Sequence, residues 1–153
     1  DGYWSRGLGD VYKRQDLQAP FTALMTIANG ESKITETIFE NRMNHINLLK
    51  KMGADIKLDK NVAYIKGVKT IKGMDLVASD LRSSAALIIA GIIAKGSSKI
   101  YGLEHLDRGY ENFESKLKIL GIKIAREFNN RGCKESEYKI DQESEEIPKC
   151  TAA

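Results

Sequence analysis

Apolar and polar residues recur along the first half of the chain with the periods of helices and strands. Apolar side chains three or four residues apart predict a helix that is capped by Asp16 and ends before Gly30, and a second stripe of this kind ends at Gly53. Two short runs with a period of two, separated by the polar turn 59–61, predict a hairpin. The predicted elements are a helix over 17–28, a strand over 33–37, a helix over 43–52, and hairpin strands over 55–58 and 62–66.

The second half of the chain repeats this pattern together with its charged residues. Asp16 recurs as Asp80, the sequence SKI recurs at 98–100, and Gly53 recurs as Gly121, at offsets of 64, 66 and 68 residues. The predicted elements of this half are a strand over 74–78, a helix over 81–92, a strand over 98–101, a helix over 110–120 and a strand over 122–128. A repeat of this length is a supersecondary unit that buries its apolar face by stacking on its neighbours.

The order of these elements predicts an α/β fold of repeated βαβαββ units, one at about 16–73 and one at about 74–128. Residues 1–15 have no sustained period and no counterpart in the second repeat, as expected of a linker-derived segment. Residues 129–153 are polar and contain charge runs such as ESEE, so we expect a disordered tail. The first unit has no opening strand of its own, and we therefore expect the chain to be a piece of a larger protein.

Composition narrows the classes of function. The 153 residues are 42% hydrophobic, and the net charge of +3 arises from interspersed basic and acidic residues, which argues against a nucleic-acid partner. The longest apolar runs are too short for a membrane span, and a signal-peptide pattern is absent, so we expect a cytoplasmic protein without a membrane partner. Cys133 and Cys150 have no closely spaced metal-ligand partners, so we expect neither a metal nor a cofactor.

The candidate chemistry lies at the starts of the predicted helices. Asp16, Asp80 and Arg82 stand where the first helix of each unit begins, and Arg42 and Arg108 stand where the second begins. Helix N-termini favour anions, an arginine adds a planar donor fork, and a carboxylate can move a proton. The plainer alternative, in which the aspartates only cap helices and the arginines only face solvent, stays open on the pattern alone.

Three motifs in order resemble a known family. They are ITETIFENR at 34–42, ASDLRSSAALIIAG at 78–91 and HLDRGYENFESKLKILG at 105–121. From Asp16 to about Arg126 the chain is similar to the UDP-N-acetylglucosamine 1-carboxyvinyltransferases, enolpyruvyl transferases of bacterial peptidoglycan synthesis. The resemblance implies a C-terminal part of an inside-out α/β barrel of three βαβαββ-like units, with helices inside and sheets outside. Such enzymes have two of these domains, and the active site lies in the cleft between them.

The resemblance also implies substrates and residue roles. The family transfers the enolpyruvyl group of phosphoenolpyruvate to the 3′-hydroxyl of UDP-N-acetylglucosamine and releases phosphate. The matching positions are Asp16 for accepting the hydroxyl proton, Asp80 near the reacting carbon, Ile38 and Phe39 at the nucleotide sugar, and Arg42, Arg82 and Arg108 around phosphoenolpyruvate and the intermediate.

The resemblance further implies that the missing N-terminal portion of the same enzyme is a partner, and that the chain alone is inactive. An alternative acceptor enzyme is 5-enolpyruvylshikimate-3-phosphate synthase, against which the segment TETIFENR argues. A non-catalytic RNA-binding or scaffold module is the alternative from a different class.

Overall fold

The chain is known from a computed structural model, which describes residues 17–37, 43–128 and 136–142. The elements of the first repeat are α2 (Gln18–Met25), β1 (Glu31–Thr35), α3 (Asn44–Lys51), β2 (Asp55–Asp59) and β3 (Val62–Lys66). Those of the second are β4 (Asp75–Val77), α4 (Leu81–Ile93), β5 (Gly96–Tyr101), α5 (Glu104–Asp107), α6 (Phe113–Ile119), β6 (Ile124–Phe128) and β7 (Ser136–Gln142). Apart from α5 and β7, each of these elements overlaps one that the sequence pattern predicts.

The strand pairing confirms the repeat. One sheet has the antiparallel order β1-β3-β2, and the other has the order β4-β5-β7-β6, in which only β4 and β5 are parallel. Ile65 of β3 lies opposite Ser32 and Ile56, and Ile140 of β7 lies opposite Ser98 and Ile124. The triplets β1-β3-β2 and β5-β7-β6 therefore share both topology and register.

Strand β7 corrects, for residues 136–142, the expectation that residues 129–153 form a disordered tail; residues 129–135 and 143–153 lie outside the described residues. Residues Ser136–Gln142 form a strand between β5 and β6, with Tyr138 and Ile140 only 2% and 0% exposed. An added Cβ at Gly91 of α4 would lie 3.1 Å from Cδ1 of Ile140, so β7 packs directly under that helix. The polar composition misleads here because only alternate residues of a sheet that is covered on one face need to be apolar.

Three predicted helix boundaries also change. The N-cap position of α2 is occupied by Leu17, which makes no side-chain hydrogen bond there. The predicted cap at Asp16 is therefore one residue too early. Asp16 itself lies outside the described residues. Helix α2 ends at Met25 because the next N–H groups bond three residues back, to Ala23, Leu24 and Met25 at 3.2–3.3 Å, which tightens the chain into turns before Gly30. Helix α6 begins at Phe113 rather than at residue 110, because Asn112 adopts a left-handed conformation with φ of 51°.

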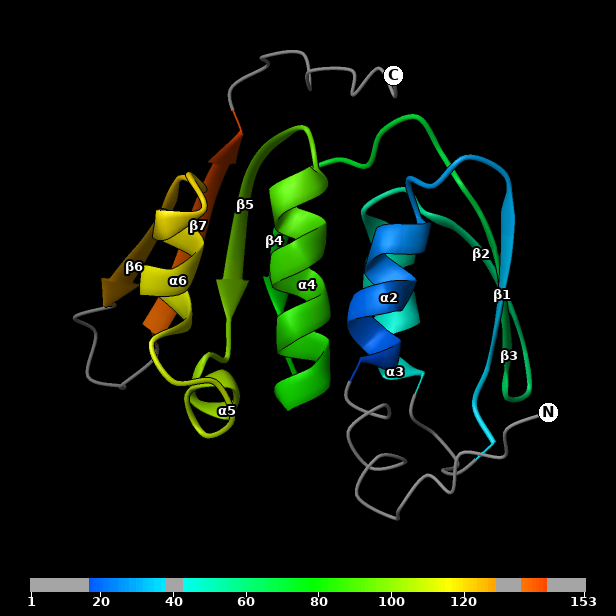
Figure 1. The fold of residues 1–153 in the computed structure, drawn as a ribbon, viewed down its shortest axis with the longest axis horizontal. Helices are drawn as coiled ribbons and strands as arrows, with labels where there is room; N and C mark the ends of the chain where they lie inside the picture. The colour runs from blue at the N-terminus through cyan, green and yellow to red at the C-terminus, as the bar shows by residue number, and fades with distance from the viewer. Residues whose placement is uncertain (1–16, 38–42, 129–135, 143–153) are drawn as a thin grey trace, which may run out of the picture.

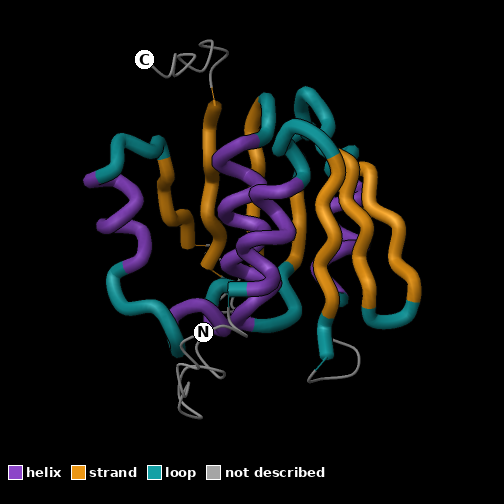
Figure 2. Tube along the Cα trace, turned by 45° about the vertical axis from the view of Figure 1, so that its right-hand side comes forward, coloured by secondary structure: helices purple, strands orange, loops and turns teal. Residues whose placement is uncertain are grey.

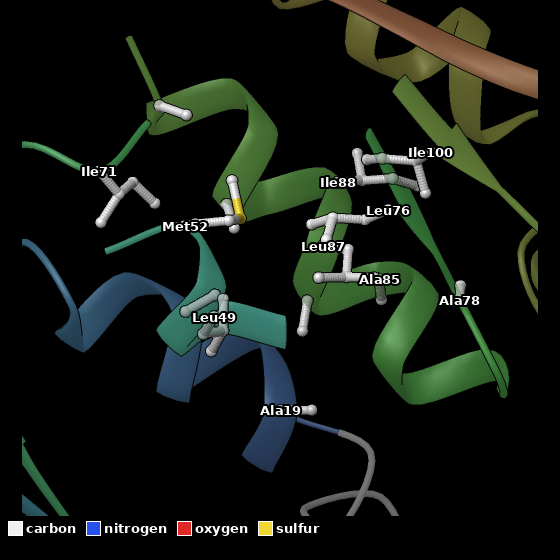
Figure 3. Close-up of a cluster of buried hydrophobic side chains, with 14 of the residues drawn as sticks. Ala19, Leu49, Met52, Ile71, Leu76, Ala78, Ala85, Leu87, Ile88 and Ile100 are labelled. Carbon is white, nitrogen blue, oxygen red and sulfur yellow. The ribbon is translucent and has the colours of Figure 1, made fainter. Parts of the chain in front are cut away.

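Helices α2, α3 and α4 lie between the two sheets, as the resemblance implies, whereas α6 packs against β6 at the outer end of the second sheet (Figures 1 and 2). The sheets bury one face and expose the other: Ala63 and Ile65 of β3 are buried, whereas Tyr64 and Lys66 are exposed. Helix α4 is buried around most of its surface, at Ser83, Ser84, Ala85, Ala86, Leu87, Ile88, Ala90 and Gly91. Figure 3 shows Leu49 and Met52 of the first repeat beside this helix, so the two repeats share one core. Within the described ranges, no helix is long and apolar enough to cross a membrane.

Candidate functional site

Several helices begin at the same end of the molecule. In Figure 1, α2, α3 and α4 start at the lower end, β1 and β5 run toward that end, and α5 lies there. Each helix start presents N–H groups without intrahelical partners and a partial positive charge. This end is therefore electrostatically suited to anions.

Asp80 is held in place by the first turn of α4. Its Oδ1 accepts hydrogen bonds from the N–H groups of Arg82 and Ser83, each at 2.9 Å, and its Oδ2 accepts one from the Ser79 hydroxyl at 3.2 Å. The Asp80 N–H donates to the Ser83 hydroxyl at 3.1 Å, which completes a capping box. The capping interpretation of Asp80 is thus confirmed, and its carboxylate has one fixed position.

The same contacts keep the Asp80 carboxylate ionised. Partial burial raises the pKa of Asp80, but hydrogen bonds from the Ser83 N–H and hydroxyl, the Ser79 hydroxyl and the Arg82 N–H outweigh it, so the pKa lies below the ordinary value of 3.8. A carboxylate with a lowered pKa is a weak base. Its chemistry favours electrostatic stabilisation of a cationic centre over proton abstraction.

Removing the Asp80 cap is expected to destabilise the chain measurably. Asp80→Ala should lower the free energy of unfolding by about 1 kcal/mol at pH 7, whereas Asp80→Asn, which keeps a capping oxygen, should cost less. Because the folded-state pKa is depressed, the carboxylate contributes its extra stability above pH 3.8 and loses it as the pH falls through the folded value. Urea unfolding from pH 7 to pH 3 measures this, and a constant difference between the unaltered chain and the Asp80→Asn variant across that range would contradict it.

The segment that carries Arg108 packs against the start of α4. Gly102 has φ of +79°, and an added Cβ there would lie 2.5 Å from the carbonyl oxygen of Ala78. At Gly109 an added Cβ would lie 2.8 Å from both Cδ atoms of Leu81. Both ends of the α5 segment thus approach residues 78–81, which contain the Asp80 cap.

Three of the predicted site residues lie at the end of the molecule where the helices begin, and the other four lie outside the described residues. Arg82 is partly buried in the first turn of α4, and Arg108, which follows α5, is exposed. Together with Asp80, these residues place two arginines and one aspartate at the same end of the fold, and arginines near a helix start are residue types that bind anions. Asp16, Ile38, Phe39 and Arg42 lie outside the described residues, although Leu17 and Met43 hold the N-cap positions of α2 and α3.

The site also depends on residues that the sequence pattern did not single out. Ser79 and Ser83 orient Asp80, and Asp107 of α5 binds Arg126 of β6. The serines could have been found from the cap sequence SDLRS, in which a capping-box residue stands three positions after the aspartate. The partners Asp107 and Arg126 are 19 residues apart and leave no comparable local signal.

Comparisons with known proteins agree with this geometry. The sequence profile of the EPSP synthase (3-phosphoshikimate 1-carboxyvinyltransferase) family matches residues 6–117. The match begins within the segment 1–15 that the pattern set apart, so the similarity extends further toward the N-terminus than expected.

Individual relatives are similar to this chain at high sequence identity. The UDP-N-acetylglucosamine 1-carboxyvinyltransferase of Prochlorococcus marinus (strain MIT 9312) is 78% identical over 138 residues, which is 90% of this chain and 30% of that protein. The enzyme of the same name from Synechocystis sp. (strain ATCC 27184 / PCC 6803 / Kazusa) is 51% identical over 111 residues, covering 72% of this chain and 25% of that protein. The chain thus spans about a quarter to a third of the length of these relatives.

Solved structures of similar fold include the enolpyruvyl transferase NikO from Streptomyces tendae, with a TM-score of 0.63 and 30% identity over 69% of this chain and 25% of that one. The EPSP synthase from Acinetobacter baumannii has a TM-score of 0.56 over 80% of this chain and 28% of its own, but only 13% identity, so it supports the fold alone.

Proposed function

Because the chain belongs to the EPSP synthase (3-phosphoshikimate 1-carboxyvinyltransferase) family, we propose that it is part of an enolpyruvyl transferase whose acceptor is UDP-N-acetylglucosamine. The observation that carries the choice of acceptor is the 78% identity to the relative of that name. The shikimate enzyme is the second candidate, and it is supported only by the family profile and by fold at 13% identity.

The groups at the helix starts suit the reaction. Phosphoenolpyruvate carries a phosphate and a carboxylate, and Arg82, Arg108 and the N-terminal end of α4 offer donors and positive charge for such anions. A proton adds to C3 of the enolpyruvyl group, so that positive charge develops on C2, and the acceptor hydroxyl loses its proton as its oxygen bonds to C2. The adduct then loses a proton from C3 while the bond from C2 to the phosphate oxygen breaks, which restores the double bond and releases phosphate. In this proposal Asp16 takes the hydroxyl proton, and the ionised Asp80 lies beside the carbon that carries developing positive charge.

Substrate contacts extend to residues outside the described ranges and beyond the chain. The proposal assigns the nucleotide sugar to Ile38 and Phe39, and the phosphoenolpyruvate anion also to Arg42. The rest of the active site comes from polypeptide that the chain does not contain, since the chain spans only about 30% of its Prochlorococcus relative. The working protein is proposed to act in the cytoplasm on these two small molecules, without a nucleic-acid or membrane partner.

The test is a chimera in which residues 16–142 of this chain replace the equivalent part of the Prochlorococcus marinus (strain MIT 9312) relative. The chimera is expected to release phosphate from phosphoenolpyruvate in the presence of UDP-N-acetylglucosamine. The chain alone is expected to show no measurable release, because a partial active site cannot exclude water or position both substrates. Phosphate release only with shikimate 3-phosphate would support the second candidate.

Two further results would contradict the proposal. Robust turnover by the purified chain would show that it needs no other polypeptide. An inactive chimera that binds RNA with a steep dependence on salt would favour the nucleic-acid-binding alternative.

A further inference from the structure

We propose that Arg126 is a positioning residue for the anion site, because it holds α5 through Asp107 and thereby fixes the backbone that carries Arg108. The functional half of this inference rests on the proposed transferase function. Its structural half concerns only contacts among described residues and can be tested on the chain itself.

Arg126 and Asp107 form a two-point contact between distant parts of the chain. Nη1 of Arg126 donates to Oδ1 of Asp107 at 3.1 Å, and Nη2 donates to Oδ2 at 2.5 Å. Two parallel bonds from a planar guanidinium fix the orientation of the carboxylate as well as its distance. The contact joins β6 to the last residue of α5, immediately before Arg108.

Arg126 is itself supported by the sheet. It lies directly opposite Tyr138 in the β6–β7 register, and its guanidinium carbon stands 5.7 Å from the centre of that ring. Tyr138 is only 2% exposed, so the surface beneath the guanidinium is part of the core. A guanidinium that stacks on a buried ring loses much of its rotational freedom. Because the sheet fixes the Arg126 guanidinium, the bonds from Arg126 fix the Asp107 carboxylate relative to the sheet.

Helix α5 needs such a support. It has four residues and no side-chain cap, which is well below the length at which a helix is stable alone. Two glycines flank it: Gly102 lies close to the backbone of Ala78, and Gly109 lies close to the side chain of Leu81. Between these two glycines, the Arg126–Asp107 contact links a side chain of α5 to the sheet of the second repeat.

The contact is expected to affect local order much more than global stability. Asp107 is 45% exposed, and ion pairs at such exposure contribute little to the free energy of unfolding. This separates the proposal from a general structural role, which would lower the stability of the whole chain.

The first experiment measures amide hydrogen exchange in the chain. The N–H groups of Asp107, Gly109 and Tyr110 donate to Leu103 and Leu106 at 2.9–3.0 Å and report whether α5 is closed. Arg126→Met and, separately, Asp107→Asn should speed their exchange about tenfold, while amides of α4 stay unchanged. Lys118→Met, which breaks the Glu114–Lys118 pair on α6, is the matched control and should leave all of them unchanged. Unaltered exchange in α5 in both variants would overturn the structural half.

The second experiment places the same variants in the chimera. Arg126→Met and Asp107→Asn should each raise KM for phosphoenolpyruvate by roughly 10- to 100-fold, while KM for the nucleotide sugar changes less than about twofold. The double variant should be no worse than either single one, because the two residues act as one unit. An active chimera whose KM for phosphoenolpyruvate does not respond would overturn the functional half alone. An unmodified chimera without turnover would overturn the proposed function and this half with it, and the exchange experiment would still decide the structural half.

Discussion

Replacing Asp16 with asparagine in the chimera is expected to lower kcat by roughly 10²- to 10⁴-fold, the usual cost of losing a general base. An amide has nearly the shape of a carboxylate but cannot accept the proton of the acceptor hydroxyl. Initial rates of phosphate release at saturating substrate measure the effect. The expectation rests on the proposed role of Asp16, which the resemblance to enolpyruvyl transferases suggests.

Asp55→Asn is the matched control for this variant. Asp55 is an exposed residue at the start of β2, at the end of that strand opposite the helix starts, so its amide variant should keep full activity. Undiminished turnover by Asp16→Asn would contradict the proposed role of Asp16 as the proton acceptor.

Deleting residues 129–153 is expected to unfold the second repeat, because it removes β7 from between β5 and β6. The deletion takes away the buried side chains of Tyr138 and Ile140, leaves β6 without its partner in the described sheet, and leaves β5 paired on one side with β4 alone. Loss of one large buried side chain costs about 2–5 kcal/mol, and a whole domain has only about 5–15 kcal/mol to lose. Circular dichroism and NMR of the shortened chain measure the result.

Two companion variants make this test specific. Deleting only 143–153 keeps β7 and should leave the fold intact, whereas Ile140→Ala should lower the free energy of unfolding by about 2–5 kcal/mol. A folded second repeat in the chain that ends at residue 128 would show that β7 is dispensable.

The repeat could be predicted from the sequence alone. The doubled pattern of an aspartate before an apolar run, SKI and a closing glycine predicted two copies of one unit, and the shared register at Ser32 and Ser98 confirms it. Such local patterns can be read from a sequence because helix and strand periods, caps and left-handed glycines depend on residues only a few positions apart. The helix-start positions of Asp80 and Arg82 were predictable for the same reason.

Strand β7 was not predicted from the sequence, although its residues alternate in the way that is typical of a strand. In SEYKIDQ the apolar residues Tyr138 and Ile140 alternate with charged ones and are buried, as Ala63 and Ile65 of β3 are. The connection before β7 is longer than the tight turn between β2 and β3, so the offset between the repeats grows from 68 residues at Ile56 and Ile124 to 75 at Ile65 and Ile140. The homology of the two strands is clear only once their common partners are known.

The sequence by itself determined the described elements other than α5 and β7, the repeat, and the charged residues at helix starts, because each of these depends on neighbours along the chain. Only the tertiary structure decided that a polar segment completes the second sheet and that Arg126 of β6 reaches Asp107 of α5. These features join residues far apart in sequence, and the energy that selects them comes from packing, strand pairing and the geometry of a guanidinium against a carboxylate. Such terms exist only after the chain has folded.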